Sequence, residues 1–553
     1  MRKYLISFVI LTAAALAQET GARYLVVTAD TFYSSIQPLV EWKHRMGYRT
    51  KVVKLSQIGS TTSAIKSYVA DAYATWDIRP EYLLLVGAPN YIPFYAFAYT
   101  CYSDNYYTNM NADIYNEILS GRLNVHNVTE AQTAVNKMLL YEKTPDLTDP
   151  SWFINACLIA REDYNTYPPP PYSDDSIYWS DIRHAKSYML ANGYNTIDTL
   201  SKLLGNNAST VVNRVNQGRA FVLYRGTATN NWYPPFAVDV NQTQNGNKLP
   251  IVLSITCGTL SSSGSPTAAE KWFYTGTPTL PRGAAGYFAT TTSGSGIAHL
   301  RSAVAKGFFN GLFAQGKQTF GQACEAGRLN VYSMYSSSTE YRGFTTIGDP
   351  SMMIWTAVPK PLEVYHDSYL SVSDTSLIID VQHNEWPVES ALVCVLLDTV
   401  VYEYGYTNVS GVIVFNFDTL FEGNMHITVT AHNKIPYLDS IPVQPTGISE
   451  ITPAVEARLS FIEASPNPFT RTTKMRYLIL DPGYSTDDYS VGIYDASGRL
   501  VRSLDQGSII QNQESVLWWD GTDNRGNRLP AGVYFVRAGS IREERSIPVV
   551  LLE

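Results

Sequence analysis

One cysteine stands where a nucleophile could act. Cys257 directly follows the apolar stretch 250–256 (PIVLSIT) and precedes Gly258. A continuous apolar run of this length predicts a buried strand, so Cys257 would lie on the loop at the carboxyl end of that strand. A thiol on such a loop can be exposed and can face backbone N–H groups that stabilise a developing oxyanion. A cysteine that merely fills the core would show the same local pattern, so both interpretations stay open.

The cysteine count supports a free thiol. The chain has five cysteines, Cys101, Cys157, Cys257, Cys324 and Cys394, which are far apart and odd in number. Exported proteins held together by disulfides usually have even, clustered cysteines. At least one thiol therefore stays unpaired within the chain, and an unpaired cysteine of an exported enzyme is a candidate nucleophile.

A second loop, 224–228 (YRGTA), follows another predicted strand. In an open parallel sheet, ligands bind beyond the carboxyl ends of the strands, so this loop could meet Cys257. A thiol reacts slowly until a neighbouring group, usually an imidazole, activates it. No histidine occurs in 224–228. His299 and His184 are the alternative bases, although each also suits an ordinary surface position.

Other chemistries are disfavoured. The net charge of -8 argues against a nucleic-acid partner, which would require a basic face. No His/Cys spacing of a zinc site and no glycine-rich phosphate loop occurs in the sequence, so we predict no metal ligands among the catalytic residues.

The elements that position these loops alternate between strand and helix patterns. Strands are predicted at 24–28, 50–55, 82–87, 155–161, 220–224, 250–256 and 286–290. Helices are predicted at 31–46, 61–75, 180–192, 299–312 and 320–335. This alternation predicts an α/β domain with a mainly parallel sheet and helices on both faces.

The pattern changes after Pro359 and Pro361. Residues 362–443 form short alternating strand patterns without a helical segment, which predicts a β-sandwich. A polar linker follows, and a second small all-β unit begins at 458. Its turn sequences DASG (495–498) and DNRG (523–526) separate alternating strands.

The N-terminus has the pattern of a signal peptide. Arg2 and Lys3 precede the apolar run 4–17, and 15–17 (ALA) places small residues at a cleavage site before Gln18. The run is shorter than the ~20 residues that a membrane-spanning helix needs. We therefore predict that the mature chain is secreted or displayed at the cell surface.

Six blocks in collinear order resemble gingipain-type cysteine peptidases over residues 22–358. They are EWKHRMGYRTKVV (41–53), YLLLVGAPNYIP (82–93), SDNYYTNMNADIYNEILSGRL (103–123), PIVLSITCG (250–258), GAAGYFATTTSGS (283–295) and TIGDPSMMIW (346–355). The resemblance implies a caspase-like α/β catalytic domain followed by an immunoglobulin-like domain.

The resemblance also implies roles for individual residues. Cys257 matches the nucleophile, and Glu162 matches the acid that orients the catalytic histidine. Asp181 matches an aspartate of the substrate pocket in arginine-specific members, which would favour a basic residue before the scissile bond. Glu270 matches a glutamate that follows the nucleophile loop.

The family keeps its histidine in a Tyr-x-Gly-His-Gly turn, and this chain departs from that pattern. By the tyrosine and glycine anchors Thr227 takes the histidine position, whereas an anchor on Trp232 would put Gly226 or Arg225 near it. Gly226 and Gly258 would border the substrate. Threonine cannot act as the general base. A second resemblance, at 465–469 (SPNPF), 491–504 and 518–538, is to the sorting and FlgD-like immunoglobulin-type domains of type IX secretion cargo.

We therefore predict a signal peptide at 1–17, α/β subdomains at 18–145 and 146–358, and immunoglobulin-like sandwiches at 359–447 and 455–553. Three functions stay open: a secreted cysteine endopeptidase acting on proteins or peptides; a catalytically degenerate homologue that binds them; and a surface protein that depends on its β-modules. The C-terminal domain would engage the secretion and sorting machinery, or act as a spacer. No cofactor is required, and the resemblance implies structural calcium near the carboxylates Asp104, Asp113 and Glu117.

Overall fold

The computed structural model describes residues 20–98, 100–398, 400–445, 458–480, 490–495, 498–504, 514–539 and 544–552. The chain forms two compact units, Met1–Thr446 and Gly447–Glu553. The predicted signal peptide lies outside the described residues. No helix in the described part of the chain combines the length and the apolar character that a membrane crossing requires.

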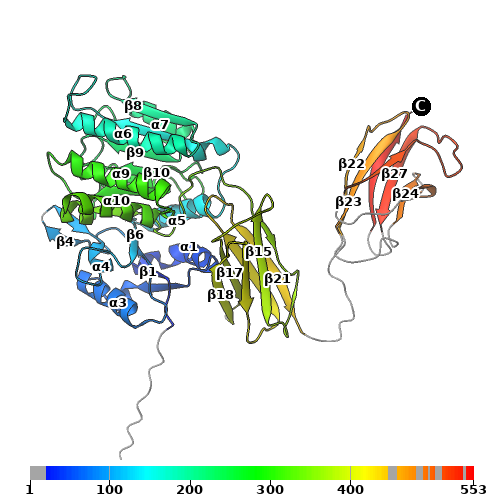
Figure 1. Cartoon of the computed structure of the whole chain (residues 1–553), viewed down its shortest axis with the longest axis horizontal. Coiled ribbons are helices and arrows are strands. Elements are labelled where there is room, and N and C mark those ends of the chain that lie inside the picture. The colour runs from blue at the N-terminus through cyan, green and yellow to red at the C-terminus, as the bar shows by residue number, and fades with distance from the viewer. Residues whose placement is uncertain are drawn as a thin grey trace, which may run out of the picture. The chain divides into compact units, whose positions relative to one another are not determined.

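A ten-stranded sheet forms the centre of the first unit (Figure 1). Its strands, in spatial order, are β2 (Thr50–Lys54), β1 (Tyr24–Thr28), β3 (Tyr82–Val86), β6 (Leu119–Leu123), β12 (Phe344–Ile347), β11 (Gly286–Thr290), β10 (Ile251–Ser254), β9 (Phe221–Arg225), β7 (Asn155–Ala160) and β8 (Thr196–Ser201). All neighbours are parallel except β11 and β12. Because Ile347 of β12 pairs with Arg122 of β6, the sheet continues across the predicted boundary between 145 and 146.

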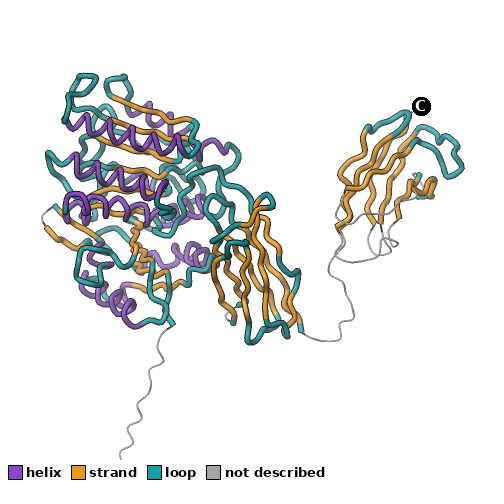
Figure 2. Tube along the Cα trace, viewed as in Figure 1, coloured by secondary structure: helices purple, strands orange, loops and turns teal. Residues whose placement is uncertain are grey.

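Helices lie against the sheet in two groups (Figures 1 and 2). One group is α1 (Tyr33–Arg45), α5 (Val128–Glu142) and α8 (Lys271–Tyr274), and the other is α6 (Asp174–Ala191), α9 (Ala298–Ala314) and α10 (Phe320–Tyr335). The remaining helices are α2 (Leu55–Ile58), α3 (Thr62–Thr75), α4 (Asn105–Thr108), α7 (Ala208–Asn216) and α11 (Ser338–Gly343). The central strands β1, β3, β7, β10 and β11 are buried at every residue, which explains their continuous apolar sequences.

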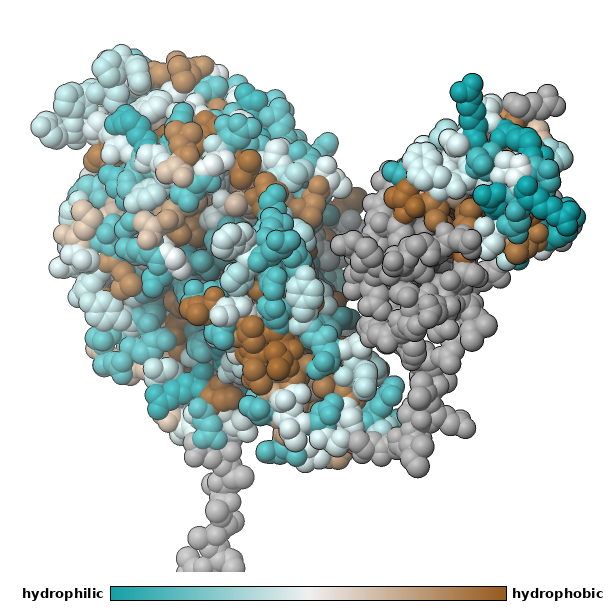
Figure 3. All heavy atoms as spheres, turned by 45° about the vertical axis from the view of Figure 1, so that its right-hand side comes forward, coloured by the Kyte–Doolittle hydropathy of each residue, from teal (hydrophilic) through white to brown (hydrophobic). Residues whose placement is uncertain are grey.

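A β-sandwich completes the first unit. One sheet holds β13 (Glu363–Tyr365), β15 (Ser376–His383), β16 (Trp386–Pro387) and β19 (Val412–Asn416). The other holds β14 (Leu370–Ser371), β21 (Tyr437–Gln444), β20 (Gly423–Thr430), β17 (Leu392–Leu397) and β18 (Val401–Tyr406). Alternate residues of β15, Leu377, Ile379 and Val381, fill its core. The face of the unit seen in Figure 3 is mostly polar, with several apolar patches, one of them larger than the others.

The second unit is also a β-sandwich. Its sheets are β22 (Arg458–Ser465), β23 (Thr473–Leu480) and β26 (Glu514–Trp519), and β25 (Leu500–Leu504), β24 (Ser490–Tyr494), β27 (Gly532–Gly539) and β28 (Glu544–Leu551). Trp519 lies at the centre of its core, with its ring centroid 5.3 Å from that of Phe469 and 5.2 Å from that of Tyr534. The predicted architecture, an α/β domain followed by two all-β domains, is confirmed.

Candidate active site

Four neighbouring strands bring the candidate residues to one edge of the sheet. β11, β10, β9 and β7 are adjacent and parallel, so the loops that follow them meet at their carboxyl ends. Cys257 follows β10, and Thr227 follows β9. Thr256 donates a hydrogen bond from its hydroxyl to the carbonyl oxygen of Gly226, which ties the two loops together.

The loop that carries Cys257 needs glycine at the next position. Gly258 has φ +40°, and a Cβ there would lie 2.7 Å from the hydroxyl oxygen of Ser293. The N–H of Gly258 donates to the carbonyl oxygen of Thr292 across 2.8 Å. This N–H is therefore already used by the loop after β11, and the expectation that Gly258 borders the substrate stays a prediction.

Cys257 is the partly exposed cysteine of the five, and all five are unpaired. Burial raises the pKa of the Cys101 thiol to about 11, and it raises those of Cys324 and Cys394 to about 12. Burial likewise raises the pKa of Cys157. These four thiols are therefore inert at neutral pH, and Cys257 is the thiol that solvent can reach.

The Cys257 sulfur has polar contacts with Arg301 and Gly294 in the described part of the chain, and the contact with Arg301 is the shorter. The Nη1 of Arg301 donates to Sγ across 2.7 Å, and the thiol can donate to the carbonyl oxygen of Gly294 at 3.4 Å. Sequence reasoning missed Arg301. Its only signal was a basic residue in the first turn of α9, the helix that follows β11 and its loop.

Thr227 faces an acid, but that acid is not Glu162. The Thr227 hydroxyl lies 2.9 and 3.1 Å from the two carboxylate oxygens of Asp163, to which it donates. Asp163 also forms an ion pair with Arg161. The structure thus brings Asp163, a residue that sequence reasoning passed over, to the position where an acid would orient a base.

Glu162 is enclosed in the core instead. Its carboxylate accepts hydrogen bonds from the indole N–H of Trp179 at 3.1 Å, from the hydroxyl of Ser201 at 2.5 Å and from the backbone N–H of Lys202 at 3.0 Å. The predicted role of Glu162 in orienting the residue at position 227 is therefore wrong. Consecutive side chains leaving a strand point to opposite sides, so Glu162 and Asp163 diverge.

Asp181 is not available to a substrate. Its carboxylate pairs with Arg225 Nε at 2.6 Å and accepts a hydrogen bond from the Ser302 hydroxyl. Both side chains are almost fully buried. Arg225 also donates to the carbonyl oxygens of Ile255 and Ala298. The prediction that Asp181 lines a pocket for a basic residue is corrected, because the chain's own arginine fills that place.

None of the eight histidines, all within the described ranges, has a recorded hydrogen bond or ion pair with Cys257. The exposed His299 has its ring centroid 5.2 Å from that of Tyr335. The ring of His184 on α6 lies 5.1 Å from that of Tyr188. In the described structure, neither His299 nor His184 thus forms a hydrogen bond with the Cys257 thiol.

Glu270 supports the loop that follows Cys257. Its carboxylate accepts hydrogen bonds from the backbone N–H of Ser261 and from the side-chain amide of Asn124, the latter at 2.8 Å. Burial raises the pKa of Glu270 to about 7. The loop therefore rests on a carboxyl group that titrates near neutral pH.

The carboxylates proposed for calcium are engaged by the protein itself. Asp104 pairs with Arg122 at 2.5 Å, Glu117 accepts from the N–H of Met110, and Asp113 accepts from the N–H of Tyr115. Among the described residues, no cluster of three or more His, Cys, Asp or Glu side chains could hold a metal ion. Structural calcium stays a prediction without support from these contacts.

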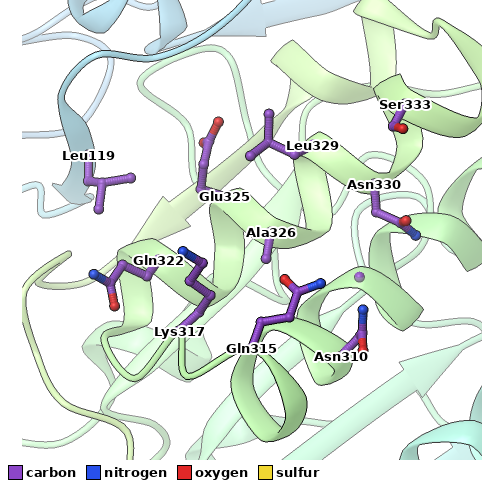
Figure 4. A pocket seen from close by; sticks show the side chains of 11 residues that line it. Leu119, Asn310, Gln315, Lys317, Gln322, Glu325, Ala326, Leu329, Asn330 and Ser333 are labelled. Carbon is purple, nitrogen blue, oxygen red and sulfur yellow. The ribbon is translucent and has the colours of Figure 1, made fainter.

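A separate hollow lies between β6, α9 and α10 (Figure 4). Its volume is about 440 Å³. Two of its amides are already bonded within the protein: Asn310 accepts from the Tyr188 hydroxyl, and Asn330 donates to the carbonyl oxygen of Ala303. The residues that line it do not include those around Cys257.

Comparison with known proteins agrees with this geometry. The sequence model of Peptidase family C25 matches residues 17–355, more than half of the chain. The chain belongs to peptidase family C25. The FlgD Ig-like domain matches residues 479–543, so the gingipain resemblance and the FlgD-like part of the second resemblance are confirmed, while the link to type IX secretion stays a prediction.

Individual relatives are distant. Gingipain R2 of Porphyromonas gingivalis is 23% identical over 519 residues, which cover 90% of this chain and 66% of that protein. Lys-gingipain of the same species is 23% identical over 480 residues, or 79% of this chain and 27% of that protein. The chain thus spans less than two thirds of the length of these relatives. The solved structure of the Arg-specific cysteine proteinase gingipain R superposes with a TM-score of 0.67 at 22% identity, over 77% of this chain and 99% of that one.

Proposed function

We propose that this C25-family protein binds polypeptide at the sheet edge that carries Cys257 but does not hydrolyse peptide bonds at the rate of a peptidase. One observation carries the proposal. The position of the base holds Thr227 bonded to Asp163, while the sulfur of Cys257 accepts its hydrogen bond from Arg301.

Amide hydrolysis needs a proton donor that this arrangement lacks. The departing amine must be protonated, and in cysteine peptidases an imidazolium does this. The Thr227 hydroxyl is neutral, and a guanidinium does not release its proton in proteins. General acid–base help is typically worth roughly 10²–10⁴-fold in rate, so its loss leaves only slow cleavage.

Family membership supports a protein or peptide as the bound molecule. The buried pair of Asp181 and Arg225 removes the reason to expect a basic residue next to the scissile position. The ligand we propose is therefore an extended polypeptide without a required arginine or lysine.

A slow cysteine endopeptidase is the second candidate, and one observation favours it. Cys257 is partly exposed, and a guanidinium lies 2.7 Å from its sulfur, so the nucleophile is accessible and lies beside a cation.

Export is part of the proposal. The charged and apolar N-terminal sequence 2–17 has the pattern of a signal peptide, and the match to the FlgD Ig-like domain fits a secreted or cell-surface protein. A partnership of the C-terminal unit with a sorting machinery follows from the same resemblance.

Turnover and binding measured side by side test the proposal. Fluorogenic peptides with basic and with apolar residues before the scissile bond would be incubated with the native chain, Thr227→His and Cys257→Ala. We expect Cys257→Ala to bind fluorescent peptides by anisotropy, and the native chain to cleave them no faster than that variant. Thr227→His places an imidazole beside Asp163 and should raise turnover by roughly 10²-fold or more. Rapid Cys257-dependent cleavage by the native chain, or no binding at all, would overturn the proposal.

A further inference from the structure

The sulfur of Cys257 is held by a cation that cannot exchange its proton. Arg301 Nη1 donates to Sγ across 2.7 Å, a short contact for an N–H donor and sulfur. A hydrogen bond from a charged donor favours the anionic form of the acceptor. The contact therefore places a fixed positive charge against the Cys257 sulfur without supplying a general acid.

The protein fixes Arg301 in this position. Its Nε donates to a carboxylate oxygen of Glu340 at 3.2 Å, and its Nη2 donates to the carbonyl oxygen of Thr292 at 3.2 Å. Only 3% of the Arg301 surface is exposed. Burial alone would lower the pKa of the guanidinium, but the charges of Glu340 and Cys257 outweigh it and raise that pKa. Arg301 thus stays charged throughout the neutral range.

We propose that Arg301 is a positioning residue that holds Cys257 as a thiolate, and that it thereby restricts the site to acyl donors whose leaving group departs as an anion. Thioesters and aryl esters belong to this class, and peptide amides do not. The inference rests on the proposed function, since it assumes that the sheet edge beside Cys257 admits an acyl group.

The chemistry balances without a proton donor. The thiolate attacks the carbonyl carbon, a carbon–sulfur bond forms, and the bond to the leaving oxygen or sulfur breaks. The electron pair leaves with a phenolate or a thiolate, so no proton moves in that step. An amide would have to release an amine, which requires protonation at nitrogen. Removal of the acyl group by water needs a base, so acyl-Cys257 accumulates.

A matched ester and amide test this restriction. The full chain would be mixed in stopped flow with an acyl-alanine 4-nitrophenyl ester or with the corresponding 4-nitroanilide, and then analysed by intact mass. We expect a burst of one nitrophenolate per chain, the mass of one added acyl group, and reaction of the anilide slower by roughly 10²-fold or more. Cys257→Ala should show neither the burst nor the added mass.

Variants of Arg301 separate its role from a purely structural one. Arg301→Met should slow the burst tenfold or more at about pH 7 and move the midpoint of the pH–rate profile for iodoacetamide to higher pH. Arg301→Lys should retain part of the effect. Lys317→Met, which removes an exposed cation next to α9, should match the native chain.

The pH–rate profile of the native chain for iodoacetamide tests the inference even if Arg301→Met fails to fold. If Cys257 in the native chain is alkylated no faster than free cysteine below about pH 7, the inference is overturned. An unchanged burst in folded Arg301→Met would also overturn it, and would leave the proposed function intact. Rapid cleavage of the anilide would instead overturn the proposed function together with the restriction to esters.

Discussion

Arg225 and Asp181 form an ion pair inside the α/β unit, with the guanidinium Nε 2.6 Å from a carboxylate oxygen and both side chains almost fully enclosed. The pair links β9 to α6 beneath the loop that carries Thr227. An acid that could have held a basic substrate side chain is thus satisfied by the protein itself. The proposed binding of polypeptide should consequently show no preference for arginine or lysine.

Removing one member of this pair should be costly. Arg225→Met leaves the Asp181 carboxylate buried beside Ser302, with Lys306 the nearest remaining cation at 3.6 Å. We expect the free energy of unfolding to fall by about 3–5 kcal/mol. Replacing both residues, as in Arg225→Met with Asp181→Leu, should recover most of that loss, because no charge stays buried. Urea unfolding of the native chain and the two variants checks this, and equal stability of Arg225→Met and the native chain would contradict it.

Alkylation should select one thiol in the folded chain. Cys257 is partly exposed, whereas Cys101, Cys157, Cys324 and Cys394 are buried and have raised pKa values. Brief iodoacetamide treatment near neutral pH should therefore modify Cys257 alone, as read by peptide mass mapping. Urea-unfolded protein is the control and should label all five. Comparable labelling of Cys324 in the folded chain would show that the helix layer opens.

Much of the α/β architecture could be predicted from the sequence, since buried parallel strands leave continuous apolar runs. The stretches predicted at 82–87 and 286–290 coincide with β3 and β11, and the helix predicted at 320–335 coincides with α10. The helix predicted from 180 begins earlier, at Asp174, because Ser173 caps it and two aspartates occupy its first turn. These polar residues hid the start of the helix from a search for apolar spacing.

The polar contacts of the site could be predicted only in part. Cys257 and Thr227 each follow a strand of a parallel sheet. Because the carboxyl ends of parallel strands lie at the same edge, the sequence could predict that these two residues share that edge. The partners Arg301 and Asp163 depend on side-chain directions after a strand or within the first turn of a helix. Asp181 and Arg225 are 44 residues apart. No local sequence pattern identifies two residues this far apart as an ion pair. The sequence therefore could not show that the Asp181 carboxylate is already paired with Arg225.

The β-sandwich of the first unit should depend on Arg23 for its attachment to the α/β domain. Arg23 donates to both carboxylate oxygens of Glu81 at 2.8 Å and to the Tyr406 hydroxyl at 3.3 Å. Its guanidinium carbon lies 4.8 Å from the centre of the Tyr404 ring. Arg23→Met should lower the free energy of unfolding by about 2 kcal/mol and speed proteolysis between the two domains.

The exposed Arg79, over the ring of Tyr73, provides the matched control for Arg23. Arg79→Met removes the same charge without touching the sandwich, so its stability should stay within about 0.5 kcal/mol of the native value. Equal effects of the two substitutions would show that Arg23 contributes only as a surface charge.

Stability should fall as pH rises from about 4.5 to about 7 because of Glu270. Burial raises the pKa of this carboxyl from 4.5 to about 7, so between these values the folded chain binds more protons than the unfolded chain. The stabilisation is full below the unfolded value and is lost as pH rises toward the folded one. At about 1.4 kcal/mol per pKa unit, the total loss is about 3 kcal/mol.

Glu270→Gln is the variant that isolates this effect. The uncharged amide cannot ionise, and Asn124, whose Oδ1 has no partner, can turn to accept from it. Urea unfolding at about pH 5.5 and about pH 8 should show a drop of about 2–3 kcal/mol for the native chain and a much smaller one for the variant. Because Glu270 bonds the loop after Cys257, the pH–rate profile for alkylation of Cys257 should show an additional step over this pH interval in the native chain, and the variant should lack that step. The same pH dependence in both proteins would mean that another group titrates.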